Sequence, residues 1–209
     1  MSKKSLVVVG GGAAGFFCAV NAARLNPHLH VLLIEKTNKL LSKVKVSGGG
    51  RCNVTHACFD IGEMSKKYPR GGNFVKKTFH HFFTTDTINW FKERGVELKT
   101  EEDGRMFPVT DSSQTIIDCL MKEAARYGVE VRLQTEVKKM QQEKENWKIE
   151  TGKEIIYATA VCIAAGGYPR LSMFEWLKEL GHSVEEPVPS LFTFNMPGHT
   201  IRELMGVTA

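Results

Sequence analysis

The stretch Gly10-Gly11-Gly12-Ala13-Ala14-Gly15 fits the pattern G-x-G-x-x-G. A short apolar strand is predicted immediately before it, over Leu6–Val9, and a helix immediately after it, over Phe16–Leu25. A second apolar strand, predicted over His30–Ile34, ends at Glu35. The order of strand, glycine turn, helix and strand is the context in which this pattern marks a dinucleotide-binding site.

The three glycines of this fingerprint have separate physical roles. Gly10 permits the tight turn after the strand, Gly12 lets the backbone approach a pyrophosphate, and Gly15 lets the helix pack closely on the sheet. Glu35 lies 20 residues after Gly15, where an acidic partner for the ribose hydroxyls is expected. A glycine-rich turn that only packs well is the alternative, and the agreement of all these signals favours the dinucleotide site. The pattern alone does not distinguish FAD from NAD.

The composition is that of an ordinary globular protein. Of its residues, 42% are hydrophobic and 24% are charged. The length of 209 residues is enough for one domain and part of another. Its net charge of +5 comes from scattered lysines and arginines without a long basic run, which favours a solvated surface over a nucleic-acid interface. No stretch approaches the ~18 apolar residues of a membrane span.

The five cysteines are an odd number and form no C-x-x-C pair. We interpret them as buried thiols in a reducing compartment, so the sequence predicts a cytoplasmic protein. No set of residues has the spacing of a metal site, and the sequence does not identify a catalytic acid or base.

Two further glycine-rich stretches carry chemical information. Ser47-Gly48-Gly49-Gly50-Arg51-Cys52-Asn53 lets backbone N–H groups and a guanidinium face an anion, and a flexible surface loop is the alternative. The second stretch, Ala164-Ala165-Gly166-Gly167, follows from a buried strand predicted over Ala160–Ala164. Strand ends of this kind border the ligand in doubly wound folds, although a tight turn explains this one equally well.

The remaining segments predict an α/β fold. Helices are expected over Phe74–Phe83, Asp86–Arg94 and Met173–Leu180, and another is capped by Asp111 or Ser112 and ends at Gly128. Residues 56–72 are expected to be irregular. Strands are expected over Val129–Leu133, Val137–Gln142, Trp147–Glu150 and Glu154–Tyr157, with a turn at 151–153 and a strand-like segment at 191–195. The prediction is a Rossmann-like domain with a mostly parallel sheet and an added antiparallel β segment near residues 129–157.

Together these motifs resemble the BaiN/YhiN-like bacterial flavoproteins, described as NAD(P)/FAD-dependent oxidoreductases or aminoacetone-oxidase-type FAD enzymes. The resemblance covers almost the whole chain and is most specific in Ser47–Thr55. It also includes Glu35-Lys36, Lys43 and the element Gly104–Pro108. Members of that family are longer, so the resemblance implies an FAD-binding domain over 1–186 without its C-terminal part, and the start of an inserted substrate domain over 187–209.

The resemblance implies FAD bound noncovalently in an extended form. The pyrophosphate would meet Gly10, Gly12, Ala13, Ala14 and Gly15. Glu35 would bind the adenosine ribose with Lys36 beside it, and the backbone of Val137 would meet adenine. The flavin side would be lined by Lys43, Ser47, Gly48, Gly49, Gly50, Arg51, Cys52 and Asn53, and Ala165 and Gly166 would border the same cofactor.

The function implied is that of an FAD-dependent oxidoreductase, in which hydride passes between the flavin and either a small organic substrate or NAD(P)H. The single fingerprint favours transient use of NAD(P)H, or an oxidase that returns electrons to oxygen. A non-catalytic dinucleotide-binding module stays open, as does a flavoprotein acting on tRNA. The expected partner is a small-molecule substrate, with no nucleic acid and no membrane. Arg105 either recognises an anionic substrate or pairs with a carboxylate.

Overall fold

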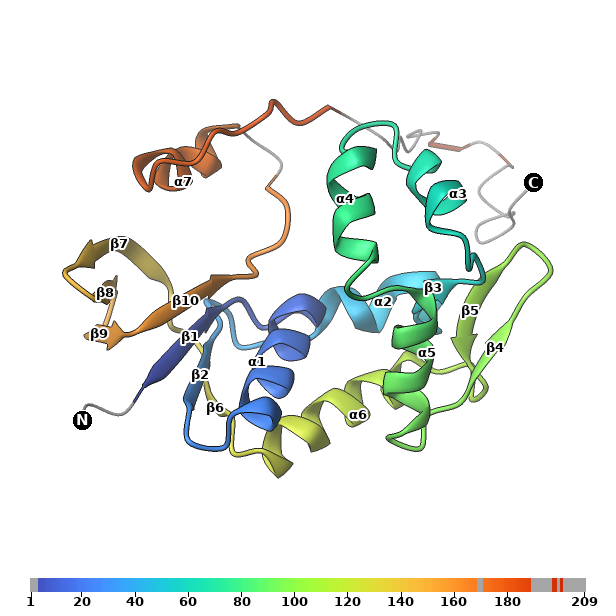
Figure 1. The fold of residues 1–209 in the computed structure, drawn as a ribbon, viewed down its shortest axis with the longest axis horizontal. Coiled ribbons are helices and arrows are strands. Elements are labelled where there is room, and N and C mark those ends of the chain that lie inside the picture. The colour runs from blue at the N-terminus through green and yellow to red at the C-terminus, as the bar shows by residue number, and fades with distance from the viewer. Residues whose placement is uncertain (1–3, 169–170, 189–196, 199, 201–209) are drawn as a thin grey trace.

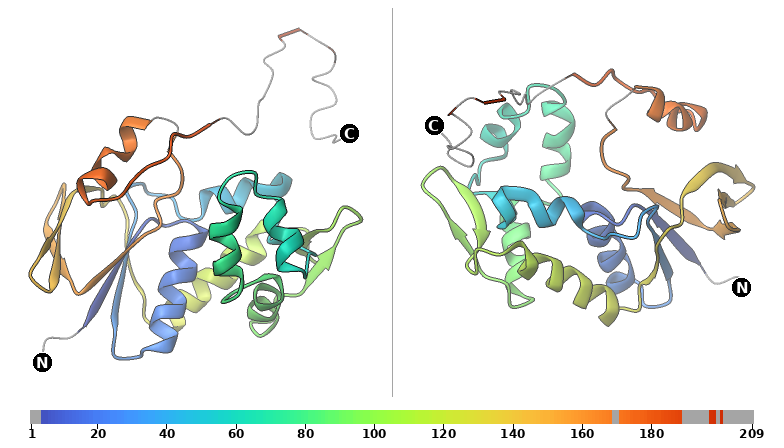
Figure 2. Two further views of the ribbon diagram at one scale, coloured as in Figure 1. Left: turned by 45° about the horizontal axis from the view of Figure 1, so that its top comes forward. Right: turned by 180° about the vertical axis from the view of Figure 1, so that it is seen from behind.

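The computed structural model describes residues 4–168, 171–188, 197–198 and 200. Its centre is a parallel sheet in the order β10-β1-β2-β6, formed by Ala160–Ile163, Ser5–Val9, His30–Ile34 and Glu130–Arg132. Helix α1 (Ala13–Leu25) and helix α6 (Ser113–Arg126) cover one face of this sheet (Figure 1). An antiparallel meander of β7 (Val137–Glu143), β8 (Asn146–Thr151) and β9 (Ile155–Ala158) covers the other face (Figure 2, left).

The central strands are buried on both faces, which explains why their sequences are apolar without alternation. Val8 and Leu33 point to the helices and pack in one cluster with Phe16. Their neighbours Val7 and Leu32 point the opposite way, into a second cluster with the meander. These five side chains are at most 3% exposed. The period of two along each strand therefore divides one apolar run between two cores.

A second region is built on α2 (Ser42–Gly50) and a small antiparallel sheet. The order of this sheet is β3 (Thr55–His56), β5 (Arg105–Pro108) and β4 (Leu98–Thr100). Three helices lie between β3 and β4 in the chain: α3 (Ile61–Lys66), α4 (Gly72–Phe79) and α5 (Thr84–Lys92). The last described elements are the short 3-10 helix η1 (Leu171–Phe174) and α7 (Glu175–Glu179). In Figure 1, α3, α4 and α7 lie on the side toward which β1 and β2 point, where α1 also begins.

The predicted α/β fold, with a parallel sheet and added antiparallel strands, is confirmed. The turn at 151–153 joins β8 to β9, with the Thr151 N–H donating to the Glu154 carbonyl at 2.9 Å. Of the two residues considered as the cap of α6, Ser112 occupies that position and accepts a hydrogen bond from the Gln114 N–H at 3.3 Å. Asp111 instead has a φ of +52° and pairs with Lys99.

Three expectations about the elements are wrong. The segment predicted over Val129–Leu133 does not belong to the antiparallel part, because β6 pairs with β2 in the parallel sheet. The strand predicted as buried over Ala160–Ala164 is an edge strand among the described residues, and Ile163 is 36% exposed. Residues 61–66, predicted as irregular, form α3, because the Asp60 carboxylate caps the helix by accepting from the Glu63 N–H at 2.8 Å. The strand-like segment at 191–195 lies outside the described residues, and the domain division at 186/187 stays a prediction.

A buried ion pair joins the segment that follows α5 to α6. The Arg94 Nε lies 2.9 Å from the Glu123 Oε2, and both side chains are less than a tenth exposed, 8% and 4%. Arg94 also donates to the Trp90 carbonyl at 2.7 Å and lies over the Trp90 ring at 3.9 Å. The guanidinium is therefore held by a carboxylate, a carbonyl and an aromatic ring, and Glu123 is its buried counter-charge.

We expect Glu123→Gln to lower the free energy of unfolding by about 2 kcal/mol, because a buried guanidinium then lacks its counter-charge. Glu93 is the matched control, since its carboxylate lies 3.5 Å from the same guanidinium but is 73% exposed. Glu93→Gln should change the stability by less than about 0.5 kcal/mol. Urea unfolding of the three proteins measures both values, and equal losses would contradict a structural role for the buried pair.

Candidate dinucleotide site

The glycine turn between β1 and α1 has contacts that only glycine permits. Gly10 has a φ of +117°, and a Cβ there would lie 2.4 Å from the carbonyl oxygen of Ala164, after β10. A Cβ on Gly15 would lie 1.9 Å from the Gly10 carbonyl oxygen, so the first turn of α1 packs directly on the turn. A Cβ on Gly12 would meet no atom within 4 Å. The backbone at Gly12 is therefore open to a ligand.

The N-terminus of α1 points its first N–H groups at this open space. Gly12 is the N-cap and makes no side-chain hydrogen bond, and the first turn, which contains Ala13 and Ala14, has no acidic residue. The first four N–H groups of a helix have no partner within it, and the helix dipole adds partial positive charge at the same end. This arrangement suits a phosphate group.

The carboxylate of Glu35 ties the end of β2 to the glycine turn. Its Oε2 accepts a hydrogen bond from the Gly11 N–H at 2.9 Å, and its Oε1 accepts from the Thr37 N–H and hydroxyl, both at 2.9 Å. Partial burial acts to raise the pKa of Glu35, but these hydrogen bonds outweigh it and hold the pKa below its usual value. Glu35 is therefore a fixed, ionised acceptor.

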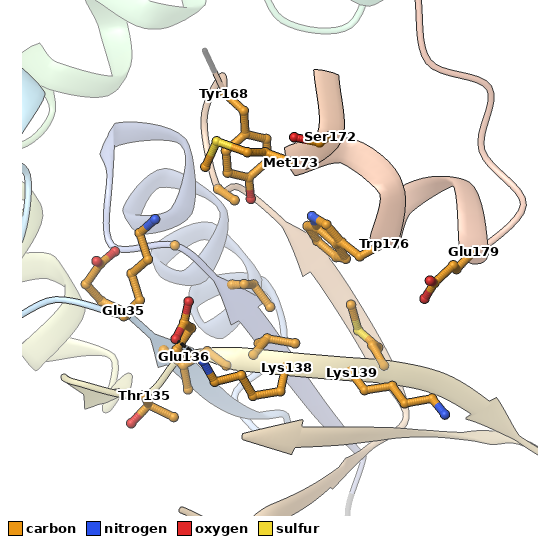
Figure 3. A pocket seen from close by; sticks show the side chains of 17 residues that line it. Glu35, Thr135, Glu136, Lys138, Lys139, Tyr168, Ser172, Met173, Trp176 and Glu179 are labelled. Carbon is orange, nitrogen blue, oxygen red and sulfur yellow. Dashed lines mark hydrogen bonds and ion pairs between the residues drawn. The ribbon is translucent and has the colours of Figure 1, made fainter. Parts of the chain in front are cut away.

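A pocket of about 370 Å³ opens beside Glu35 (Figure 3). It is enclosed by the ends of β1 and β2, the start of β7, the segment after β10, and η1 with α7. Five predicted cofactor-binding residues contribute to its lining: Gly10, Glu35, Lys36, Val137 and Ala165. The structure thus brings together, from distant parts of the sequence, the residues predicted for the adenosine half of the cofactor.

One wall of this pocket consists of residues that the sequence patterns do not predict. Tyr168, Met173 and Trp176 lie across the pocket from Glu35, on the segment that includes η1 and α7 (Figure 3). Trp176 also packs against the apolar cluster beneath the meander. Burial raises the pKa of the Tyr168 hydroxyl, and a hydrogen bond with Trp176 acts in the opposite direction. The aromatic residues that follow Gly166 and Gly167 are a sequence signal for an apolar wall. No local pattern, however, predicts that this segment folds back over the pocket.

Lys43 approaches the glycine turn from the start of α2. A Cβ on Gly166 would lie 3.7 Å from the Lys43 Nζ, and Ala164 of the same segment contacts Gly10. The Leu41 N–H, just before α2, donates to the Gly11 carbonyl at 2.8 Å. The structure therefore places an ammonium group beside Gly166, in the segment that contacts the glycine turn at Gly10.

The predicted loop at 47–53 forms a compact turn at the far end of α2. Helical backbone ends at Ser47, which has a ψ of 148°, and Gly48, Gly49 and Gly50 follow with φ angles of 55°, 66° and 87°. The Cys52 N–H closes the turn by donating to the Ser47 carbonyl at 2.9 Å. Burial raises the pKa of the Cys52 thiol, and a hydrogen bond with Ser47 acts to lower it by a smaller amount. The thiol is therefore neutral at physiological pH.

The glycines of this turn differ in what surrounds them. A Cβ on Gly48 would lie 2.7 Å from the Phe107 ring and 2.9 Å from the Asn53 nitrogen, whereas a Cβ on Gly49 would meet nothing within 4 Å. Gly48 is therefore required by packing against the protein itself, and Gly49 leaves its outer side open.

We expect Gly48→Ala to lower the free energy of unfolding by about 2 kcal/mol, because overpacking adds to the strain of a left-handed backbone. Gly49→Ala should cost about 1 kcal/mol, from backbone strain alone. Urea unfolding of the two variants measures the difference, and equal losses would contradict the packing role of Gly48.

The two arginines near this turn are engaged with carboxylates. The Arg51 guanidinium pairs with Glu101 and lies over the Phe107 ring at 4.0 Å, and its pKa is raised, chiefly by the hydrogen bond with Glu101. Without a ligand the guanidinium is therefore directed at Glu101, and its contact with an anion stays a prediction. The Arg105 Nε lies 2.6 Å from the Asp103 Oδ2. Of the two alternatives for Arg105, pairing with a carboxylate is the one observed.

The predicted residues therefore form two groups, one at each end of α2. The first group lines the pocket or the glycine turn, and the second group is the turn at 47–53, which does not line the pocket. Helix α2 connects them, since it starts beside the glycine turn and ends at Gly50 (Figure 1). This arrangement suits a ligand that is longer than a mononucleotide.

Residues 4–204 match the HI0933-like protein Rossmann domain. The chain is 24% identical over 206 residues to the 3-dehydro-bile acid delta(4,6)-reductase of Clostridium scindens, which covers 96% of this chain and 49% of that protein. It is 29% identical over 167 residues to the ribosomal RNA dihydrouridine synthase of Escherichia coli, covering 80% and 40%, respectively. It is 26% identical over 214 residues to that of Haemophilus influenzae, covering 97% and 52%. The chain thus spans about half the length of these relatives.

Among solved structures, the fold is similar to that of THI4 from Thermovibrio ammonificans, with a TM-score of 0.53 and 12% identity over 84% of this chain and 62% of that chain. This likeness concerns the fold alone. Within the described ranges, no helix has the length and apolar character needed to cross a membrane. The match over 4–204, together with the fingerprint and the sheet order described above, shows that the chain belongs to the HI0933-like Rossmann-domain family, which confirms its resemblance to the BaiN/YhiN-like proteins.

Proposed function

We propose that this chain binds FAD in an extended conformation and forms the cofactor-binding part of a flavin-dependent reductase. The observation that carries the proposal is the pocket beside Glu35, whose lining includes Gly10 of the glycine turn, together with the open space at Gly12 of the same turn. A cavity for a nucleoside, a fixed carboxylate and a helix N-terminus are the three features that an adenosine diphosphate group requires. The residues present therefore fit the adenosine half of FAD.

Each part of the cofactor would have its own contacts. Glu35 would accept hydrogen bonds from the ribose hydroxyls, and adenine would occupy the pocket between the Val137 backbone and the wall that carries Trp176. The first N–H groups of α1 would bind the pyrophosphate, with the Lys43 ammonium offsetting part of its charge. The turn at 47–53 would border the flavin ring, whose two-electron hydride chemistry is supplied by the cofactor itself.

The names of the relatives support a class of reaction. A delta(4,6)-reductase and a dihydrouridine synthase are both named for the reduction of a carbon–carbon double bond. We propose the same reaction type for the protein to which this chain belongs, with a small organic molecule as the first candidate substrate. The single fingerprint supports NAD(P)H as a transient electron donor. The five free cysteines support the proposal of a cytoplasmic location.

A uridine in ribosomal RNA is the second candidate substrate. Two relatives, at 29% and 26% identity, carry that activity in their names, which favours an RNA more than the sequence alone did. A non-catalytic dinucleotide-binding module remains the third candidate, and it makes a different prediction: FAD binds but is not reduced.

Anaerobic flavin reduction tests these proposals. The full chain is loaded with FAD and mixed with NADH or NADPH while the visible absorbance of the flavin is followed. We expect bleaching with at least one nicotinamide, and faster reoxidation when a conjugated enone or an unmodified ribosomal RNA is added. Bound flavin that neither nicotinamide reduces would support the non-catalytic module. Failure to bind FAD would contradict the proposal as a whole.

A further inference from the structure

Helices α3 and α4 gather basic side chains that are scattered in the sequence. Residues 59–83 contain two carboxylates, Asp60 and Glu63, and five cationic side chains, all exposed: Lys66, Lys67, Arg70, Lys76 and Lys77. Helix α3 packs against α4, so these side chains belong to one unit, which we call the α3–α4 surface (residues 59–83; Figure 1). The structure therefore concentrates positive charge that the linear sequence shows only as separate pairs.

Three of these cations are available to a partner. Lys66 lies 2.6 Å from the Glu63 Oε1, and Arg70 lies 3.8 Å from the Glu185 Oε2. Among the residues that the structure describes, no carboxylate lies within 4 Å of the ammonium groups of Lys67, Lys76 and Lys77. Within the described part of the chain, these three charges therefore have no carboxylate partner.

The same surface carries exposed aromatic rings. Phe74 is 75% exposed, Phe59 is 61% exposed and Tyr68 is 42% exposed. Phe74 and Lys77 are three residues apart on α4 and therefore share one face of the helix. The Tyr68 ring rests against Phe79, with centroids 5.9 Å apart, which fixes its position. Helices α3 and α4 contain no buried residue, so Phe74 does not border a core within this unit.

We propose that the α3–α4 surface binds single-stranded RNA, with Lys67, Lys76 and Lys77 on phosphates and with Phe74 and Tyr68 stacked on unpaired bases. Unpaired cations interleaved with exposed rings are the two kinds of contact by which proteins bind single strands. A double helix would use the cations but hide the faces of its bases from the rings. An acidic protein is the other partner that charge alone permits, and the two relatives named for ribosomal RNA favour RNA.

The position of the surface agrees with this role. The α3–α4 surface follows the turn at 47–53 in the chain and lies on the side of the molecule where α1 begins (Figure 1). RNA bound there would lie at the end of α2 at which we propose the flavin ring. The inference thus rests on the proposed function for its choice of RNA as substrate, and it adds the surface that would bind it.

The test compares two triple variants of the full chain, each with FAD bound. Lys67→Glu/Lys76→Glu/Lys77→Glu changes the proposed surface, and Lys92→Glu/Lys122→Glu/Lys153→Glu makes the same change in charge at exposed lysines elsewhere. Fluorescence anisotropy measures binding of a labelled, uridine-rich single-stranded RNA over a range of salt concentrations. We expect the first variant to bind at least about 30-fold more weakly. Its slope of log affinity against log salt should fall by about 2, at about 0.7 for each phosphate that a lysine no longer neutralises.

Phe74→Ala is the second variant, because it removes stacking without changing charge. We expect it to weaken RNA binding about 10-fold with an unchanged salt slope, since stacking of one base contributes about that much. Equal losses in the two triple variants, or a wild-type chain that binds a duplex as tightly as the single strand, would overturn the proposal. Protection of Lys67, Lys76 and Lys77 from amine labelling without RNA would also overturn it, and would indicate that protein covers the surface. Flavin reduction by NAD(P)H, measured on the same samples, shows separately whether the proposed function holds.

Discussion

Gly12→Asp is expected to weaken FAD binding by about 100-fold or more while leaving the free protein at least as stable as before. The carboxylate would extend from the N-cap into the open space at which the pyrophosphate is proposed to bind. Two like charges brought together in this way cost several kcal/mol, and about 3 kcal/mol corresponds to a factor of roughly 100 in affinity. Aspartate is a preferred N-cap residue, so the helix itself should not be weakened.

This prediction is specific because one substitution should lower the FAD affinity without lowering the stability of the free protein. Gly12 has a φ of −91°, which other residues adopt without strain, and a Cβ there meets no atom within 4 Å. Titration with FAD, followed by quenching of flavin fluorescence, measures the affinity, and thermal unfolding without FAD measures the stability. Gly152→Asp, in the exposed turn between β8 and β9, is the matched control and should leave the affinity unchanged. Unchanged FAD affinity in Gly12→Asp would mean that the pyrophosphate does not lie at α1.

Glu35→Gln is expected to weaken FAD binding by about 50-fold. An amide accepts hydrogen bonds from the ribose hydroxyls less strongly than a carboxylate does, and it has one oxygen instead of two for the donors on Gly11 and Thr37. Hydrogen bonds to a charged group contribute about 1.5–3 kcal/mol, which corresponds to a factor of roughly 10–100. Without FAD, the variant should lose about 1 kcal/mol of stability at neutral pH, since the N–H groups of Gly11 and Thr37 then share a weaker acceptor. The matched control is Glu154→Gln, which changes an ion-paired carboxylate outside the pocket.

The difference in stability between the wild-type protein and Glu35→Gln should depend on pH, because the pKa of Glu35 is lowered in the folded protein. A carboxyl group whose pKa is lower in the folded state stabilises the fold above its unfolded pKa, near 4.5, and this contribution is lost as the pH falls through the folded value. The stability difference between the wild-type protein and Glu35→Gln should therefore be constant at neutral pH and shrink below pH of about 4. Urea unfolding at several pH values measures it. A difference that grows on acidification would contradict the assigned role of the carboxylate.

The parts of the fold that the sequence predicts are those determined by local pattern. The apolar strands on both sides of the fingerprint, and the spacing of Gly10, Gly12 and Gly15, are properties of a short segment, and the structure has the predicted strand–helix–strand unit there. Helix α3 was missed although its signal was present, because Asp60 and Glu63 have the spacing of a helix cap within a segment that contains several turn residues.

The parts that the sequence does not predict depend on contacts between distant segments. Trp176 lines the pocket because α7 folds back over the meander, and no pattern near Trp176 encodes that contact. The pairing of Arg51 with Glu101 likewise joins residues that are distant in the chain, and no pattern near Arg51 encodes it. The lysines of α3 and α4 form one surface only because the two helices pack together. Local pattern therefore predicts the elements, and tertiary packing decides which side chains remain available to a ligand.

The central claim, that this chain binds FAD, is tested most directly by the visible absorption spectrum of the purified protein before and after denaturation by heat. We predict flavin bands in the native protein, or after incubation with FAD and removal of the excess, and FAD as the chromophore released on heating. A protein that stays colourless after incubation with excess FAD would contradict the account, whereas release of a flavin without adenosine would contradict the role assigned to the pocket beside Glu35.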